Sequence, residues 1–176
     1  MIAMKPLFVC VIAFVYAMSS SAQSTPTADA ILKEARAKAA KENKNVMVIF
    51  HASWCGWCHK MDTSLNDPSI KDFFYKNYVI THLVISESKD KKNLENPGAA
   101  ELNKQWGGGD QGIPFWVIMD KNGKILADSQ KKRGENVGCP ATAEEVAHFI
   151  NVLKKTSSIT DDQIAKVEKR FRRNEL

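Results

Sequence analysis

Short apolar runs alternate with amphipathic stretches along this chain, and their order predicts an α/β fold. Residues 46–50 are apolar and rich in β-branched side chains, which favours a buried strand, and residues 78–85 repeat that pattern. Residues 29–44 place small apolar side chains among Lys, Glu and Arg at helical spacing, so they predict an amphipathic helix that covers one face of a sheet. A second helix, from the Cys55 region through Leu65, would join the two strands as a β-α-β unit with the expected right-handed crossover.

Turn and capping signals mark the elements that follow. Asp67 is expected to cap a new helical turn, and Pro68 to occupy its first position. Residues 86–98 are polar and charged, so we expect a surface loop there, the part of the chain best suited to disorder. A short helix should follow over residues 99–106, ahead of a glycine-rich approach to Pro114.

The last third of the chain predicts a hairpin and two helices. Asn-Gly stands between the apolar runs at residues 115–120 and 125–128, and this dipeptide is the strongest short signal of a β-hairpin. An irregular basic loop is expected over residues 129–140. Two capping boxes, which begin at Thr142 and Thr160, then open two further helices, the second of them basic.

The N-terminus has the pattern of a secretory signal peptide over residues 1–22. Lys5 precedes an apolar run over residues 7–18, and small residues then lead to Ala22 as the expected cleavage site. The run is shorter than the roughly 20 residues that a membrane span needs, although an uncleaved anchor is the alternative. We therefore expect a periplasmic or secreted protein with no stable membrane anchor after cleavage.

A length of 176 residues suits a single domain with its own hydrophobic core. The domain is expected over residues 23–176, with its core at about 28–155 and a C-terminal helical extension at 156–176. The net charge is +5, and basic residues cluster at 131–133 and 169–173, with Phe171 as the single aromatic residue among them. Solvated surface is therefore favoured over a nucleic-acid partner.

Four cysteines define the candidate chemistry. Cys10 lies in the predicted signal peptide, which leaves the closely spaced Cys55 and Cys58 and the isolated Cys139 in an oxidising compartment. Cys55 is expected at a helix start, where unpaired N–H groups and the helix dipole lower a thiol pKa from roughly 8.5 towards 7 or below. Cys55 is therefore the predicted nucleophile, and Cys58, nearly one turn later, its resolving partner.

The run from Phe50 to Cys58, FHASWCGWC, together with the later Gly112-Ile113-Pro114, resembles the thioredoxin superfamily, specifically its exported thioredoxin-like thiol-disulfide oxidoreductases. The resemblance covers about residues 28–155. It implies a thioredoxin-like fold with a central mixed β-sheet flanked by helices, and a redox-active disulfide between Cys55 and Cys58. It also implies protein thiols or disulfides as substrates and a separate redox partner, and it calls for no metal and no organic cofactor.

The same resemblance assigns substrate-binding positions. Pro114 would be a cis-proline opposite the cysteine pair, and the Ile113 backbone would pair with an extended substrate. An ordinary trans proline at a strand start is the alternative for Pro114. Trp54, Gly56 and Trp57 would shape access to Cys55, although packing into the core is an equal interpretation of Trp57.

One departure from the family pattern concerns proton transfer. The family's buried aspartate, six residues before the first cysteine, is replaced by Ile49, so His59 and His51 become the candidate bases. The dipeptide between the cysteines is Gly-Trp rather than Gly-Pro. Redox potential and partner choice are therefore not inherited, and reductant, oxidant and isomerase all stay open.

Other interpretations of the same residues also stay open. Cys55 to His59 matches Cys-x-x-Cys-His, the attachment pattern of covalent haem, although the expected strand-to-helix junction disfavours it. Zinc binding by the pair with His59 or His51 lacks a second pair of ligands. The pair could also be a structural disulfide in a redox-inactive peptide-binding module. Cys139 is a regulatory or second resolving thiol or, as we favour, a small packed residue.

Overall fold

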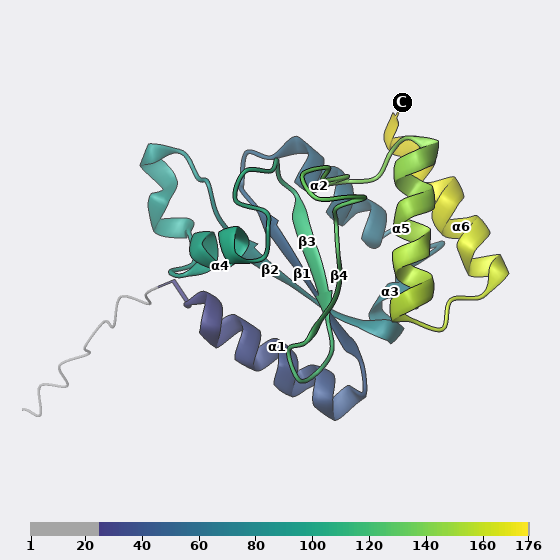
Figure 1. Ribbon diagram of the computed structural model, residues 1–176, viewed down its shortest axis with the longest axis horizontal. Helices are drawn as coiled ribbons and strands as arrows, with labels where there is room; N and C mark the ends of the chain where they lie inside the picture. The colour runs from purple at the N-terminus through teal and green to yellow at the C-terminus, as the bar shows by residue number, and fades with distance from the viewer. Residues whose placement is uncertain (1–24, 176) are drawn as a thin grey trace, which may run out of the picture.

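The computed structural model describes residues 25–175, so the predicted signal peptide, residues 1–22, and Cys10 lie outside the described residues. The domain has a central sheet with helices on both faces (Figure 1). In chain order the elements are α1 (Ala28–Glu42), β1 (Asn45–His51), α2 (Gly56–Leu65), α3 (Lys71–Asn77), β2 (Tyr78–Val84), the 3-10 helix η1 (Lys89–Leu94), α4 (Ala99–Gln105), β3 (Phe115–Met119), β4 (Ile125–Asp128), α5 (Ala143–Thr156), α6 (Asp161–Phe171) and the 3-10 helix η2 (Arg172–Glu175).

The sheet is mixed, with strand order β2-β1-β3-β4. β1 pairs in parallel with β2, from Asn45 opposite Tyr78 to His51 opposite Val84. β3 runs antiparallel to both β1 and β4, and a tight turn at Asp120 to Lys124 joins β3 to β4. The predicted fold class and the predicted hairpin are confirmed.

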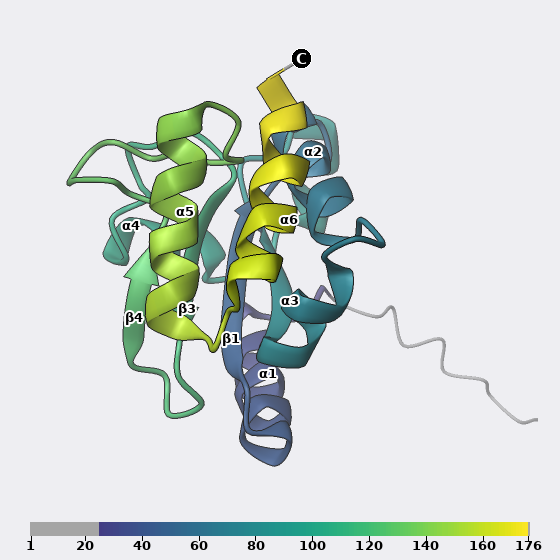
Figure 2. The same cartoon turned by 90° about the vertical axis from the view of Figure 1, so that its right-hand side faces the viewer.

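Alternating side chains of β1 supply two hydrophobic cores. Val46, Val48 and Phe50 pack with α1 and α4 on one face, whereas Met47 and Ile49 pack with the other helices on the opposite face. Figure 2 shows α5 and α6 side by side on that second face, with α2 and α3 beside them. β1 therefore lies at the centre of the domain, and its last residue leads directly to the cysteine pair.

The C-terminal helix packs against the domain rather than projecting from it. Val167 and Phe171 are fully buried, and the Phe171 ring centroid lies 4.9 Å from that of Phe149 on α5. Both predicted capping boxes form, with the Thr142 and Thr160 side chains accepting backbone N–H groups at the starts of α5 and α6. The predicted C-terminal extension is thus an α-helix that shares the main core.

Asp67 caps a new turn as predicted, but Pro68 does not begin α3. Asp67 accepts the Ser69 N–H at 2.9 Å through its side chain and the Lys71 N–H at 2.8 Å through its carbonyl, and it pairs with Arg170 Nε at 2.9 Å. α3 begins only at Lys71, and its N-cap Ile70 makes no side-chain capping bond. A hydrogen-bonded turn therefore separates α2 from α3, because the Asp67 carboxylate closes a local turn and binds the C-terminal helix.

Residues 86–98 lie mostly at the surface, as expected, but they form an ordered segment instead of a loop suited to disorder. The segment forms η1, and two of its polar side chains, Glu87 and Asn96, are buried. Asn96 accepts the Val84 N–H at 2.7 Å and donates to the Pro26 carbonyl at 2.9 Å. Polar composition misled the prediction because these groups make internal hydrogen bonds. Among residues 25–175, no helix has the length and apolar character needed to cross a membrane.

Candidate active site

Cys55 is the N-cap of α2, as the sequence predicts. β1 ends at His51, a turn closed by the Cys55 N–H to the Ala52 carbonyl follows, and α2 begins at Gly56. The Cys55 sulfur accepts the Cys58 N–H at 3.1 Å, so the sulfur occupies the position of a capping oxygen. An anionic sulfur at this position is stabilised by the helix N-terminus.

Cys55 and Cys58 are joined by a disulfide, with their Cα atoms 5.2 Å apart. Both are buried, and together with Ala52 they form a small cluster against Ile113. The Ile113 carbonyl oxygen lies 3.5 Å from the Cys55 sulfur. The cysteine pair and the loop at residues 112–114, which are far apart in sequence, therefore meet at one place.

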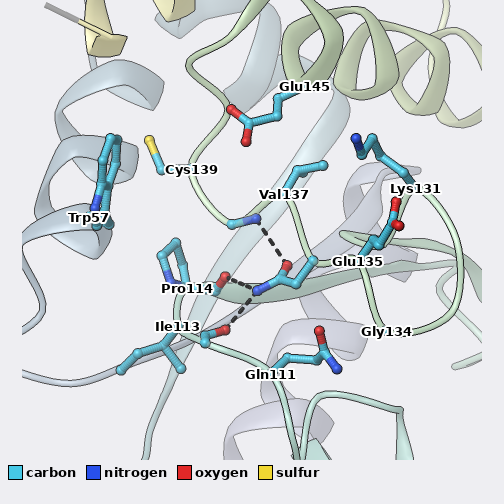
Figure 3. A pocket seen from close by; sticks show the side chains of 13 residues that line it. Trp57, Gln111, Ile113, Pro114, Lys131, Gly134, Glu135, Val137, Cys139 and Glu145 are labelled. Carbon is cyan, nitrogen blue, oxygen red and sulfur yellow. Dashed lines mark hydrogen bonds between the residues drawn. The ribbon is translucent and has the colours of Figure 1, made fainter.

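The loop that faces the pair is held by a residue that the sequence analysis missed. The Ile113–Pro114 peptide bond is cis, which confirms the expectation for Pro114. Asn136 donates its side-chain N–H groups to the Gly112 carbonyl at 2.7 Å and to the Pro114 carbonyl at 3.1 Å (dashed lines, Figure 3). Its side-chain oxygen accepts the Gly138 N–H at 3.0 Å. Within residues 25–175 the Ile113 N–H itself has no hydrogen-bond acceptor.

A groove of about 560 Å³ adjoins the cis-proline. Trp57 and Cys139 border it on one side and Lys131 and Glu135 on the other, with Pro114 between them (Figure 3). Of the charged groups that line it, Lys131 pairs with Glu144 and Glu135 with Lys132, each at 2.7 Å, while Glu145 accepts the Ala141 and Thr142 N–H groups. The groove therefore offers backbone and apolar surface more than free charge.

Two tryptophans frame the cysteine pair. Trp54 is 59% exposed and Trp57 48% exposed, so Trp57 is a surface residue and not a core residue. The Trp54 indole N–H donates to the Ser86 carbonyl at 2.8 Å, and the Lys60 ammonium lies 4.6 Å from the Trp57 ring centroid. Exposed aromatic rings in fixed positions suit contact with a partner protein.

Glu87 is a buried carboxylate beside the loop that precedes Cys55, and the sequence analysis missed it. Its two oxygens accept the Ser53 N–H at 2.6 Å and the Ser53 hydroxyl at 2.8 Å. The Glu87 N–H in turn donates to a Glu95 carboxylate oxygen at 2.7 Å. The segment at residues 86–95 therefore fixes the backbone two residues before the nucleophile.

Four polar side chains lie near the end of β1. His59 is exposed, and its Nε2 lies 2.9 Å from the Ser53 carbonyl oxygen. Burial, and then the nearby His82, lowers the pKa of His51 below its ordinary value. The His51 and His82 rings meet edge to face with centroids 4.9 Å apart, and His82 Nε2 lies 2.8 Å from Asp62 Oδ1. The sequence analysis named His51 and His59 but missed His82 and Asp62.

Cys139 is buried and is not part of the disulfide pair. Its sulfur lies 3.3 Å from the side-chain nitrogen of Asn174, and burial raises its pKa to about 12. A thiol with so high a pKa is a poor nucleophile at neutral pH. These observations favour the interpretation of Cys139 as a packed residue. In the part of the chain that the structure describes, no three His, Cys, Asp or Glu side chains are grouped so that they could hold a metal ion.

A family model described as thioredoxin-like matches residues 27–121. The fold is similar to that of a disulphide isomerase from Xylella fastidiosa Temecula1, at 21% identity over 93% of this chain and 100% of that chain, with a TM-score of 0.50. A thioredoxin from Thermus thermophilus is 22% identical over 75% of this chain and 86% of that chain, with a TM-score of 0.45. The C-terminal domain of DsbD from Neisseria meningitidis is 23% identical over 59% and 84%, with a TM-score of 0.40.

No protein of curated function matches the sequence. The family match covers more than half of the chain and includes both cysteines and the cis-proline. The family match therefore assigns the chain to its family, and the similarity to the Xylella structure agrees with the fold. The chain belongs to the thioredoxin-like family and has the Cys-x-x-Cys pair of a thiol-disulfide oxidoreductase.

Proposed function

We propose that this protein exchanges disulfides with extended segments of exported proteins, with Cys55 as the nucleophile and Cys58 as the resolving cysteine. The observation that carries the proposal is the meeting of three features: the Cys55 sulfur at the start of α2, the partner sulfur of Cys58, and the Ile113 carbonyl 3.5 Å from Cys55. The first makes a reactive thiolate, the second closes the cycle, and the third lies where a substrate would bind.

In the reducing direction the Cys55 thiolate attacks a substrate disulfide and forms a mixed disulfide, while one substrate sulfur leaves as a thiolate and takes up a proton. Cys58 then loses its proton and attacks the Cys55 sulfur. This step closes the Cys55–Cys58 disulfide and releases the second substrate sulfur. Two electrons pass from the dithiol to the substrate, and the oxidising direction is the reverse. The cycle needs neither a metal nor an organic cofactor.

The substrate is expected to bind as an extended chain along the cis-proline loop. Asn136 occupies the Gly112 and Pro114 carbonyls, whereas the Ile113 N–H between them stays unpaired within residues 25–175 and can bind a substrate carbonyl. The approach to Cys55 is bordered by the exposed rings of Trp54 and Trp57. Gly56 lies between these two residues in the chain and adds no side chain that would obstruct a substrate. A protein disulfide should therefore react faster than a small one of equal potential.

Proton transfer at Cys58 requires a base other than the family's aspartate, because Ile49 is buried at that position. Of the two histidines that the sequence suggests, His51 is the one that packs inside the site, because its ring meets His82 edge to face and burial lowers its pKa. His59 is exposed and lies against the Ser53 carbonyl.

The site of action is proposed to be the periplasm or the exterior of the cell. The support is the signal-like sequence at residues 1–22, and an oxidising compartment would keep Cys55 and Cys58 cycling between thiol and disulfide.

The first test is equilibration of the protein in graded thiol/disulfide buffers, followed by acid quenching, alkylation and a mass count of free thiols. A reversible two-thiol transition is expected at Cys55 and Cys58. A midpoint near roughly −270 mV would indicate a reductant, and one near roughly −120 mV an oxidant. Absence of the transition would favour a peptide-binding module, or a haem carrier if the protein were coloured.

Variants separate the roles of the cysteines. Cys55→Ser should abolish exchange, whereas Cys58→Ser should accumulate mixed disulfides with protein partners, and Cys139→Ser should do neither. A Cys55→Ser protein that exchanged disulfides at the wild-type rate would refute the assignment.

A further inference from the structure

Asp62 and His82 lie where the family's buried aspartate is missing. Ile49, which replaces that aspartate, is paired in register with His82 on the neighbouring strand β2. Side chains directly opposite each other in paired strands are close neighbours on the same face. Asp62 reaches His82 from α2, with Oδ1 2.8 Å from the His82 Nε2. A carboxylate is thus present at this end of the sheet, but it comes from the helix and not from the strand.

The helix also connects this carboxylate to the resolving cysteine. Cys58 and Asp62 are four residues apart in α2, so their side chains lie on successive turns of one face, with about 5–6 Å between Cβ atoms. Cys58 is buried, whereas the Asp62 and His82 side chains are 37% and 33% exposed. Asp62 is therefore one helical turn from the buried Cys58 and in direct contact with an imidazole that is partly open to water.

We propose that the Asp62–His82 pair, backed by His51, receives the proton that Cys58 gives up when it resolves the mixed disulfide. The inference rests on the proposed function and extends it to the second chemical step. The Cys58 S–H bond breaks, its proton passes to the pair, and the Cys58 sulfur bonds to the Cys55 sulfur. The substrate sulfur leaves as a thiolate with the bonding electrons of the mixed disulfide. It then takes up the proton from the Asp62–His82 pair, which returns to its starting state.

Asp62, His82 and His51 form a cluster, and the groups around it come from β1, β2, α2 and the segment after β2. His51 ends β1. Its four neighbours are His82 on β2, Asp62 and His59 on α2, and Glu87 just after β2, and each of them acts on the pKa of His51. Asp62 and Glu87 favour a proton on His51, whereas burial, His82 and His59 oppose it. The carboxylates and imidazoles therefore lie close enough to act on one another at this end of the sheet.

The test follows the resolving step alone. Reduced protein is mixed with oxidised glutathione, quenched with acid at successive times, and analysed by mass spectrometry. The Cys55–glutathione adduct reports the first step, and its conversion to the internal disulfide reports the second. Asp62→Asn and His82→Gln remove the carboxylate and the imidazole with little change of volume, and Glu168→Gln, at an exposed carboxyl on α6, is the matched control.

At pH 7 the two variants should form the adduct at the wild-type rate and resolve it about tenfold to a hundredfold more slowly, within the usual range for loss of a general base. The pH dependence of resolution between about pH 5 and 7.5 should flatten in both. At higher pH the variants should approach the wild type, because hydroxide in solution can then remove the Cys58 proton without help from the pair. Glu168→Gln should match the wild type throughout.

The inference is overturned if Asp62→Asn and His82→Gln both resolve the adduct at the wild-type rate with the wild-type pH profile. A purely structural pair would lower the unfolding midpoint without changing that profile, and this outcome also overturns it. The two variants are tested separately, so failure of one to fold leaves the other to decide. If the wild-type protein forms no adduct at all, the proposed function itself fails, and the inference with it.

Discussion

The hydrogen bonds of Asn136 give a direct test of what holds the cis-proline loop. Asn136→Ala removes three of them, two to the Gly112 and Pro114 carbonyls and one from the Gly138 N–H. A net hydrogen bond contributes about 0.5–1.5 kcal/mol, and Asn136 is only half-buried, so water replaces part of the loss. We expect the free energy of unfolding to fall by about 2 kcal/mol.

Asn136→Asp separates hydrogen bonding from packing, because the side chain keeps its shape. At pH 7 the carboxylate would still accept the Gly138 N–H but would face two carbonyl oxygens without a donor. This variant should therefore be less stable than Asn136→Ala at pH 7, and should recover part of the difference below about pH 4, where the carboxyl is protonated. Asn122→Ala, at an exposed position in the β3–β4 turn, is the control.

Urea unfolding followed by tryptophan fluorescence measures these differences. With a slope of about 2 kcal/mol/M, a loss of about 2 kcal/mol lowers the midpoint by about 1 M. The same variants should reduce a protein disulfide such as insulin more slowly than the wild type does, yet react equally with oxidised glutathione, since only an extended substrate needs the Ile113 backbone in place. An Asn136→Ala midpoint equal to that of the wild type, or an Asn136→Asp protein more stable than Asn136→Ala at pH 7, would refute the reasoning.

Three further predictions follow from the core and from the buried titratable groups. Phe171→Ala should lower the free energy of unfolding by about 3–5 kcal/mol, because the ring is fully buried against Phe149. Ile164→Ala, on the partly buried side of α6, should lower it by less than half as much in the same urea assay, and equal effects would mean that α6 is peripheral. Burial lowers the pKa of both His51 and His148, so the unfolded chain takes up more protons than the folded protein as the pH falls through about 6.5. The urea midpoint should therefore drop between pH 7.5 and 5.5, and the drop should be smaller in His148→Gln. An unchanged midpoint in the wild type would contradict the lowered pKa values. In the reduced native protein at pH 8, iodoacetamide should modify Cys55 at least tenfold faster than Cys139, whose pKa is raised to about 12 by burial; comparable rates by peptide mass mapping would show that Cys139 is accessible.

Local signals in the sequence predicted much of the fold. The hairpin at Asn122-Gly123 and the capping boxes at Thr142 and Thr160 depend on contacts within four residues, and all of them form. The position of Cys55 at the start of α2 is local in the same sense, because strand β1 and helix α2 follow each other directly. Asp67 likewise caps a local turn through its bond to Ser69, although α3 begins only at Lys71.

The polar residues around the site could not be predicted in this way, because their partners are distant in sequence. Glu87 and Ser53 are 34 residues apart, and Asn136 and Pro114 are 22 apart. Asp62 and His82 are 20 apart and meet only because β2 pairs in register with β1 beneath α2. An Asn or Glu in a polar loop has the composition of solvated surface, and only the tertiary fold distinguishes it from a buried partner.

In this protein Ile49 replaces the family's buried aspartate, and the carboxylate that contacts the neighbouring His82, that of Asp62, is not buried. A carboxylate at the Ile49 position would be 1% exposed in the present packing, and an unpaired charge in such surroundings is strongly disfavoured. Moving the carboxylate to Asp62 on the adjacent turn of α2 keeps it near Cys58, pairs it with His82 and leaves both groups in contact with water. The apolar core beneath the cysteines is then continuous through Met47, Ile49 and Met61, while the proposed proton acceptors lie at the rim of the sheet. Under the proposal, stability and proton handling thus depend on different residues in this protein, the apolar Ile49 for the first and the Asp62–His82 pair for the second.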